Sequence, residues 1–254
     1  MENKIKVKKL SEHIYAMDDA GATGYVVLGK EKALIIDTMN GSEDLKAVVR
    51  TITDLPVMVV NTHGHGDHIY GNVYFEEAYL HPADFSLALE FASYPEFVEE
   101  ANKRGLSMPV FKEIQDGTVI DLGGATVDVI LLPGHTPGGI CLLYREERVL
   151  FTGDGINCNL WMQLDHSLQM KELKKSLENI SWVKEQADTI LHGHTMDYND
   201  ISLVDELYKG VCDLIDHPEQ AETDPDYKWF GGVAKQHVFG EGKVICYVPE
   251  KLKG

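Results

Sequence analysis

Residues 61–72 read NTHGHGDHIYGN and directly follow the apolar run Val57–Val60. Three imidazoles and one carboxylate stand within six positions of this stretch: His63, His65, Asp67 and His68. Imidazole nitrogens and carboxylate oxygens are ligands that divalent zinc, and to a lesser extent iron or manganese, accepts with little strain. The intervening glycines lack a Cβ, so the backbone can turn tightly while the side chains converge. We interpret this stretch as a metal-binding turn, the alternative being a polar loop whose histidines cap strands and helices.

The composition is typical of a soluble globular protein. The chain has 254 residues, of which 44% are hydrophobic and 25% charged, and this size suits one large α/β domain with a sizeable core. Lys and Arg number 23 against 41 Asp and Glu, which gives a formal charge of −18. A surface this acidic repels nucleic acid and anionic membranes. We therefore expect a small-molecule substrate, no nucleic-acid partner and no membrane association.

Two further absences in the sequence bear on location. No apolar stretch approaches the ~20 residues of a membrane span, and the charged start Met1–Lys6 lacks the apolar core of a signal peptide. The four cysteines stand far apart without CxxC spacing, so the sequence indicates neither a disulfide framework nor a thiolate zinc site. We expect a cytoplasmic protein.

The first third of the chain predicts a β meander followed by a strand, helix, strand unit. The expected strands are Ile5–Leu10, Ile14–Met17, Tyr25–Leu28, Ala33–Ile36 and Val57–Val60. Between the last two, apolar residues spaced i, i+3, i+4 and i+7 from Leu45 to Ile52 predict a helix, with Ser42 as its N-cap. The 61–72 turn thus lies at the carboxyl end of a strand, where α/β sheets commonly place ligands.

A helical insert is expected at about residues 82–115, within a single domain that spans residues 1–254. The insert is rich in helix formers and aromatic residues, among them Phe85, Phe91 and Tyr94. These side chains would form an apolar wall or lid over a pocket, ordinary helix packing being the alternative.

Three later strand ends also carry His or Asp beside Gly. His135 lies in the turn Pro133–Gly139, Asp154 follows a predicted hairpin, and His194 follows the strand Thr189–Leu191. Metal sites are assembled from distant turns of this kind, so we predict that these side chains join the 61–72 turn in one site. A C-terminal hairpin, Ala234–Phe239 with Lys243–Val248, would border the site or pair with a second subunit in a homodimer.

The motifs resemble those of the metallo-β-lactamase superfamily. Its HxHxDH motif is matched by residues 63–68, its later ligands follow in order at His135, Asp154 and His194, and Asp37 matches its first acidic motif. The resemblance covers residues 14–194. It implies a four-layer αββα sandwich with metal ions at one edge of two sheets.

The resemblance also implies a dinuclear site. One divalent ion, most simply zinc with iron or manganese as alternatives, would be held by His63, His65 and His135. A second would be held by Asp67, His68 and His194, with Asp154 bridging both. A water between the two ions would ionise near neutral pH and attack an electrophile. Asp67 would orient this nucleophile as the catalytic residue, while Asp37 would support the ligand loops without binding metal.

Departures from the family patterns narrow the reaction. His65 stands where flavodiiron relatives carry Glu, which favours hydrolysis over reduction of oxygen or nitric oxide. No cysteine stands in a motif that matches the thiolate ligand of class B1 β-lactamases, so antibiotic hydrolysis is not favoured. We expect cleavage of an ester-like bond in a lactone, thioester or small ester, as in the lactonase and glyoxalase II groups. The alternatives are a small-molecule phosphodiesterase or sulfatase, a mono-iron oxygenase of the same fold and a noncatalytic metal-binding module.

Further roles near the site remain open in the sequence. Four side chains are candidates for the acid that protonates the leaving group, with a structural role as the alternative for each: Tyr70, His166, His192 and Tyr198. Trp161 and Met162 would line the pocket or pack in the core.

Overall fold

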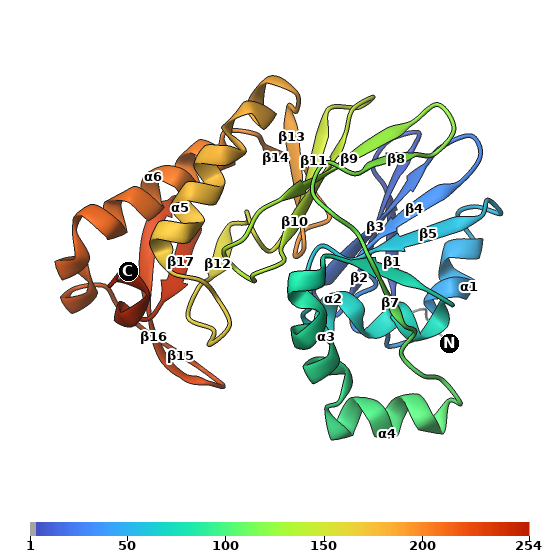
Figure 1. The fold of residues 1–254 in the computed structure, drawn as a ribbon, viewed down its shortest axis with the longest axis horizontal. Helices are drawn as coiled ribbons and strands as arrows, with labels where there is room; N and C mark the ends of the chain where they lie inside the picture. The colour runs from blue at the N-terminus through green and yellow to red at the C-terminus, as the bar shows by residue number, and fades with distance from the viewer. Residues whose placement is uncertain (1–3, 254) are drawn as a thin grey trace.

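Two large β-sheets pack face to face in the computed structural model, which describes residues 4–253 (Figure 1). The first sheet has seven strands in sequence order: Lys6–Lys9 (β1), Ile14–Asp19 (β2), Ala22–Leu28 (β3), Ala33–Ile36 (β4), Val57–Val60 (β5), Ala78–Leu80 (β6) and Phe111–Glu113 (β7). Its first four strands pair antiparallel and its later pairs are parallel. The predicted meander and the following strand, helix, strand unit are confirmed.

The second sheet has six strands in the order β14-β13-β11-β10-β9-β8. They are Val119–Asp121 (β8), Thr126–Leu131 (β9), Ile140–Tyr144 (β10), Val149–Gly153 (β11), Thr189–His192 (β13) and Asn199–Asp200 (β14). β11 and β13 are parallel neighbours, so their carboxyl ends meet at one edge of the sheet. This pairing brings together two of the strand ends that the sequence singles out.

Helices cover the outer faces of the two sheets, which gives the expected αββα sandwich. The α-helices are Leu45–Arg50 (α1), Gly66–Ile69 (α2), Phe85–Ala92 (α3), Pro95–Lys103 (α4), Met170–Asn179 (α5) and Leu203–Asp216 (α6). Short 3-10 helices occupy Tyr70–Tyr74 (η1), Pro82–Asp84 (η2), Ser181–Glu185 (η3), Pro218–Glu222 (η4) and Pro249–Leu252 (η5). α1 packs on the first sheet, while α5 and α6 pack on the second.

Strand β10 shows that the second sheet is covered on both of its faces. All five of its residues are buried, because successive side chains point to opposite faces and both faces are covered. Leu142 and Tyr144 pack between the two sheets, whereas Cys141 and Leu143 pack against α5 and α6. The strand therefore reads as a continuous apolar run.

A third, four-stranded sheet extends the sandwich at the C-terminal end, in the order β12-β17-β16-β15 (Figure 1). Its strands are Asn159–Trp161 (β12), Asp226–Trp229 (β15), Gly232–Gly240 (β16) and Lys243–Tyr247 (β17). The predicted hairpin forms β16 and β17. The sequence did not predict β12 or β15. The sheet packs on α6 so closely that a Cβ at Gly210 would lie 2.4 Å from the Cβ of Phe239.

Two local expectations were wrong. The insert is helical only from residue 82 to 103, because Phe111–Glu113 pairs with β6 as the edge strand β7. The N-cap of α1 is Asp44, whose carboxylate accepts from Ala47 N at 3.0 Å. Ser42 instead donates its hydroxyl hydrogen to Asp19 Oδ1 at 2.5 Å, which anchors the loop before the helix.

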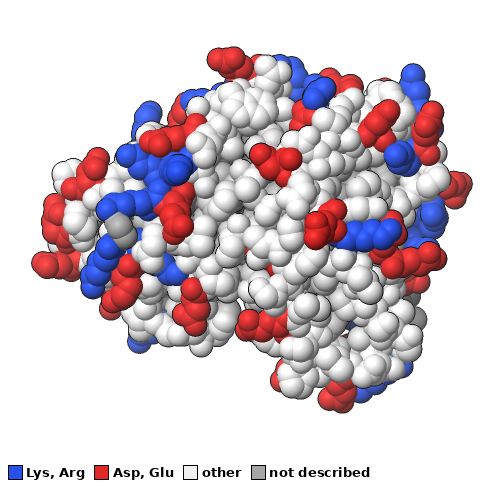
Figure 2. Space-filling view, in the orientation of Figure 1, with Lys and Arg blue, Asp and Glu red and all other residues white. Residues whose placement is uncertain are grey.

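The surface and the cysteines agree with the sequence analysis. Acidic side chains, with basic ones among them, are spread over the face shown in Figure 2. All four cysteines are free. Among residues 4–253 there is no helix that is both long and apolar enough to cross a membrane.

The packing between the two sheets gives a stability prediction. Phe151 is 1% exposed and contacts the Tyr25 ring across the two sheets. Phe151→Ala should lower the free energy of unfolding by about 3–5 kcal/mol in urea titration, because it removes a buried ring and leaves a cavity. The control Val110→Ala, at a site 83% exposed, should change it by less than about 0.5 kcal/mol. Equal effects of the two variants would contradict this packing.

Candidate metal centre

Ligand-type side chains from four turns meet at one edge of the sandwich, where the two sheets come together. The 61–72 turn follows β5 of the first sheet. The turns that carry His135, Asp154 and His194 follow β9, β11 and β13 of the second sheet. All seven side chains that the sequence analysis assigned to metal binding lie in this region, in three overlapping groups: His63, His65 and His135; His63, His68 and Asp154; Asp67, His68 and His194.

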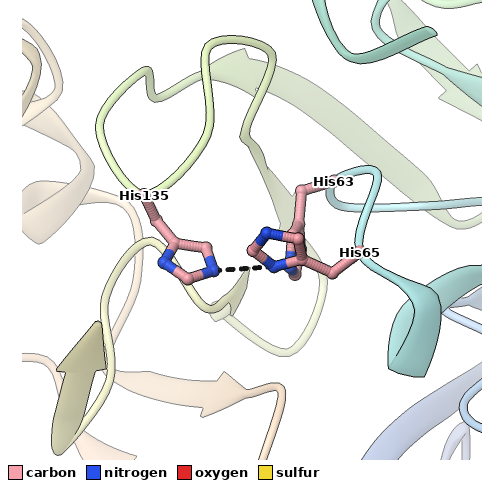
Figure 3. A group of neighbouring side chains, drawn as sticks. All are labelled: His63, His65 and His135. Carbon is pink, nitrogen blue, oxygen red and sulfur yellow. Dashed lines mark hydrogen bonds between the residues drawn. The ribbon is translucent and has the colours of Figure 1, made fainter. Parts of the chain in front are cut away.

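The first group is three buried histidines whose ring nitrogens point toward one another (Figure 3). His65 Nδ1 lies 2.9 Å from His63 Nε2 and 3.0 Å from His135 Nε2. His135 Nδ1 lies 2.7 Å from the carbonyl oxygen of Trp161 and must donate to it, so in the neutral ring Nε2 carries no proton. Burial lowers the pKa of all three histidines, and neighbouring imidazoles lower it further. The group thus presents bare nitrogen lone pairs to a single point.

The other two groups combine carboxylates with imidazoles. His68 Nε2 lies 3.7 Å from both Asp67 Oδ2 and Asp154 Oδ1, and His194 Nε2 lies 3.0 Å from Asp154 Oδ2. Burial alone would lower the pKa of His68, but the carboxylates of Asp67, Asp37 and Asp154 raise it well above its usual value. Asp154 likewise raises the pKa of His194 to about 9. These two histidines therefore occupy an acidic environment, unlike the first group.

Asp154 lies between the three-histidine group and His194. Its Oδ2 atom is 3.8 Å from His135 Nε2 as well as 3.0 Å from His194 Nε2. Burial raises the pKa of this carboxyl, but His194 and His68 bring it well below its usual value, so the group is ionised. A single carboxylate thus faces both sets of imidazoles.

The residues present fit divalent cations. Among the described residues, two buried atoms that face each other, His68 Nε2 and Asp154 Oδ1, have no hydrogen-bond partner. A buried polar atom without a partner is costly, and a cation bound to both atoms would remove that cost. Imidazole nitrogens and carboxylate oxygens are also the donor set that zinc accepts. The backbone of Gly193 can approach Asp154 closely because glycine has no Cβ, which at this position would lie 2.4 Å from Asp154 Oδ1.

Asp37 supports this arrangement from behind. It directly follows β4 with a φ of 59°, and its carboxylate accepts from the backbone N–H and the hydroxyl of Thr62, each at 2.7 Å. Its Oδ2 atom also lies 2.8 Å from His68 Nδ1, which turns His68 Nε2 toward Asp154. Such a contact fixes the tautomer and the orientation of a ligand histidine. Asp37 thus takes the position of a supporting residue.

Asp84 is a second supporting carboxylate, and the sequence analysis missed it. It ends η2 at 0% exposure, accepts from Gly64 N at 2.9 Å and accepts from Gly138 N at 2.6 Å. It therefore ties the 61–72 turn to the turn that carries His135. Gly138 permits this contact, because a Cβ there would lie 2.8 Å from Asp84 Oδ1. No motif in the helical insert marks Asp84.

A cavity of about 940 Å³ opens beside the two groups. It is lined by His65, Asp67, Glu90, Phe91, Tyr94, His135, Asp154, Asn157, Asn159, Trp161, Leu164, Asp165, His166, His194, Trp229, Phe230 and Gly231. The volume lies in the range of small-molecule sites. Because five of the seven ligand-type residues form part of the wall, a small molecule in this cavity would touch the candidate centre.

Only one of the four candidate acids, His166, lines this cavity. Its Nε2 atom lies 2.5 Å from His65 Nε2, the nitrogen that points away from the three-histidine group. Burial lowers the pKa of His166 to about 4, so its neutral ring can accept from His65 and fix that ring. Tyr70 instead donates to the carbonyl oxygen of Phe91 at 3.3 Å, and His192 Nδ1 accepts from His194 N at 3.3 Å.

The two residues that the sequence analysis considered for the pocket wall, Trp161 and Met162, have different positions. Trp161 lines the cavity, and its carbonyl oxygen contacts His135. Met162 is fully buried in the core between the second sheet, α5 and α6. Tyr198, the remaining candidate acid, is partly exposed and lies outside the cavity lining.

Comparison with known proteins identifies the family. The profile of the metallo-beta-lactamase superfamily matches residues 18–196, more than half of the chain. The chain therefore belongs to the metallo-beta-lactamase superfamily.

The sequence is similar to those of several named enzymes. An acyl-coenzyme A thioesterase of Gallus gallus is 31% identical over 51% of this chain and 56% of the relative. An atrochrysone carboxyl ACP thioesterase of Pseudocercospora fijiensis is 28% identical over 74% of this chain and 52% of the relative. A hydroxyacylglutathione hydrolase of Francisella tularensis is 25% identical over 62% and 56%, respectively. The chain spans about half the length of the curated relatives it matches.

Solved structures show the same fold. A metallo-beta-lactamase from Pontibacter korlensis superposes with a TM-score of 0.64 at 20% identity, covering 82% of this chain and 99% of that protein. A metallo-beta-lactamase from Erythrobacter litoralis gives the same TM-score at 19% identity, covering 84% and 99%. At this level of identity the likeness concerns the fold alone.

Asp84 gives a prediction for the site. Asp84→Asn replaces one acceptor oxygen by an amide N–H that faces a backbone N–H, so the two ligand turns lose their common anchor. We expect zinc affinity, measured by competition with a chromogenic chelator, to fall about 10- to 100-fold. Asp216→Asn, at an exposed site on α6, is the matched control and should keep the affinity of the unchanged protein. Unchanged affinity in Asp84→Asn would show that this anchor does not position the ligands.

Proposed function

We propose that this chain is a dinuclear metal-dependent hydrolase of ester-like bonds, with thioesters as its main substrates. The observation that carries the proposal is the convergence of seven ligand-type side chains beside a cavity of substrate size. One ion would be held by His63, His65 and His135 and the other by Asp67, His68 and His194, with Asp154 bound to both.

Two observations favour a thioester. Of the named relatives, two are thioesterases and the third is a hydroxyacylglutathione hydrolase. In addition, three of the four candidate acids do not line the cavity. A thiol ionises near pH ~8.5, so a thiolate can leave without being protonated, whereas an alkoxide cannot. A thioester therefore suits this cavity better than an alkyl ester.

The metal ions and the protein side chains have different roles in the proposed reaction. When bound, the two divalent ions supply Lewis acidity and lower the pKa of water. Asp67 lines the cavity with a partly exposed carboxylate and can accept a hydrogen bond from the attacking water, which orients it toward the acyl carbon. Water adds to that carbon and the C–S bond breaks, which yields a carboxylate, a thiol and one proton.

The remaining side chains hold this geometry. His166 fixes His65, Asp37 fixes His68, and the carbonyl oxygen of Trp161 fixes His135. Reactive groups held in place before substrate binds reduce the entropic cost of reaching the transition state.

A substitution of Asp154 tests the proposal. Asp154→Asn removes the charge that faces both ligand groups, so metal content should fall below the roughly two equivalents expected for a two-metal site. Thioester turnover should fall at least about 100-fold, since a metal ligand matters at least as much as its outer partners. Elemental analysis and a thiol-release assay measure the two effects, with Asp216→Asn as the control.

Other outcomes would point to the alternatives. A protein that is active with one iron and consumes oxygen is an oxygenase of the same fold. Metal-loaded protein that cleaves phosphodiesters or sulfate esters in preference to thioesters would replace the proposed substrate class. No turnover on lactones, thioesters, phosphodiesters and sulfate esters would identify a noncatalytic metal-binding module.

A further inference from the structure

Aromatic side chains from two distant parts of the chain face the same cavity. One wall comes from α3 and the residues that follow it, with Phe91 and Tyr94. The other comes from the third sheet, with Trp161 on β12 and Trp229 and Phe230 at the turn between β15 and β16. In Figure 1 this turn and α3 extend toward the same side of the molecule, and in Figure 2 the surface between them is indented. The β15–β16 hairpin lies outside residues 18–196, which the family profile matches.

The three rings of the third sheet form one cluster, which we call the aromatic cluster: Trp161, Trp229 and Phe230. Their ring centroids lie 4.7 Å apart for Trp229 and Phe230, 5.9 Å for Trp161 and Trp229, and 6.2 Å for Trp161 and Phe230. Phe230 is nevertheless 90% exposed. An apolar surface of this kind beside a cavity is typical of a binding site.

The turn itself holds the aromatic cluster in place. Trp229 pairs with Gly232, so Phe230 and Gly231 form the tip of the hairpin. The indole of Trp229 packs over this tip, and a Cβ at Gly231 would lie 2.2 Å from its ring. The glycine therefore allows the ring to lie on the backbone of its own turn.

The opposite wall extends the apolar surface to the candidate metal centre. The ring of Phe91 lies 5.0 Å from that of Tyr94 and 5.3 Å from that of His65. A group bound between Phe91 and the aromatic cluster would consequently lie next to the ligands. This is where the acyl part of a substrate must lie for attack at its carbonyl carbon.

Outside the candidate metal centre, the charged side chains of the lining are all acidic. Among the described residues that line the cavity there is no Lys or Arg. Asp67, Asp154 and His194 belong to the candidate metal centre, and the charged lining residues outside it are Glu90 and Asp165. Lys251 donates to the carbonyl oxygens of Asp165 and Ser167 but is not part of the lining. An anionic group away from the metal ions would face these two carboxylates and no Lys or Arg, which disfavours its binding.

We propose that the cavity selects an uncharged apolar acyl group, above all an aromatic one, held between Phe91 and the aromatic cluster. This inference rests on the proposed function and specifies its substrate: a thioester of an apolar carboxylic acid and not of a dicarboxylic acid. The physical basis is the burial of apolar area and the contact between aromatic rings, each of which strengthens binding.

Four thioesters that share one neutral leaving group test the selectivity. The zinc-loaded full chain is assayed with the N-acetylcysteamine thioesters of acetate, hexanoate, phenylpropionate and succinate. The ratio of kcat/KM for phenylpropionate to that for acetate should be at least about 10, the discrimination that an apolar pocket supplies. Succinate should be cleaved at least about tenfold more slowly than hexanoate.

Variants of the hairpin tip locate the selectivity. Phe230→Ala and Trp229→Ala should each reduce the phenylpropionate-to-acetate ratio about tenfold. Gly231→Ala should reduce it as well, because the new methyl group displaces the Trp229 ring while every aromatic residue is retained. Val238→Ala, at a site 63% exposed on the same hairpin, is the control and should leave the ratio unchanged.

A binding measurement separates this inference from the proposed function. The probe is the phenylpropionate thioester with its carbonyl replaced by a methylene, which cannot be hydrolysed. It should quench tryptophan fluorescence saturably, and Phe230→Ala should weaken its Kd about tenfold. If no thioester is cleaved but this binding result holds, the hydrolase proposal fails and the aromatic site stands. If acetate and phenylpropionate thioesters are cleaved equally well, or Phe230→Ala leaves the ratio unchanged, the inference is wrong and the hydrolase stands.

Discussion

The three-histidine group imposes the constraint on which the site depends. His65 Nδ1 lies 2.9 Å from a ring nitrogen of His63 and 3.0 Å from one of His135, and burial keeps the three rings neutral. Lone pairs that face one another in a buried site repel unless a cation lies among them. The surrounding structure must therefore hold the rings together before any cation binds. Two buried carboxylates, Asp37 and Asp84, do so by accepting hydrogen bonds from the turns that carry the ligands.

The sandwich determines where such a site can form. Parallel pairing of β4 with β5 and of β11 with β13 places successive strand ends at a common edge, and packing of the two sheets brings these edges together. Tyr25 links the two sheets there, since its hydroxyl lies 2.7 Å from the carbonyl oxygen of His192. The third sheet and α3 then add apolar walls to a centre made of polar groups. The candidate metal centre and the apolar walls of the cavity thus come from different parts of the chain.

The sequence predicted this centre better than its surroundings, for physical reasons. Ligand residues lie in short motifs at strand ends, where local spacing carries the signal. Asp84 carries none, because its partners lie 20 and 54 residues away and only folding brings them close. Strand β15 was missed, because its four residues are too few to give a clear pattern and its stability comes from pairing with β16. For the same reason β7, three residues on the edge of the first sheet, was taken for part of a helical insert.

The central claim is that the turns assemble one site for two metal ions. Anomalous scattering from native crystals, measured at the zinc, iron and manganese absorption edges, tests it most directly. The account predicts two ions of one or more of these metals, one bound by His63, His65 and His135 and the other by Asp67, His68 and His194. A single iron, or the absence of any ion at these residues in crystals soaked with zinc, would contradict it.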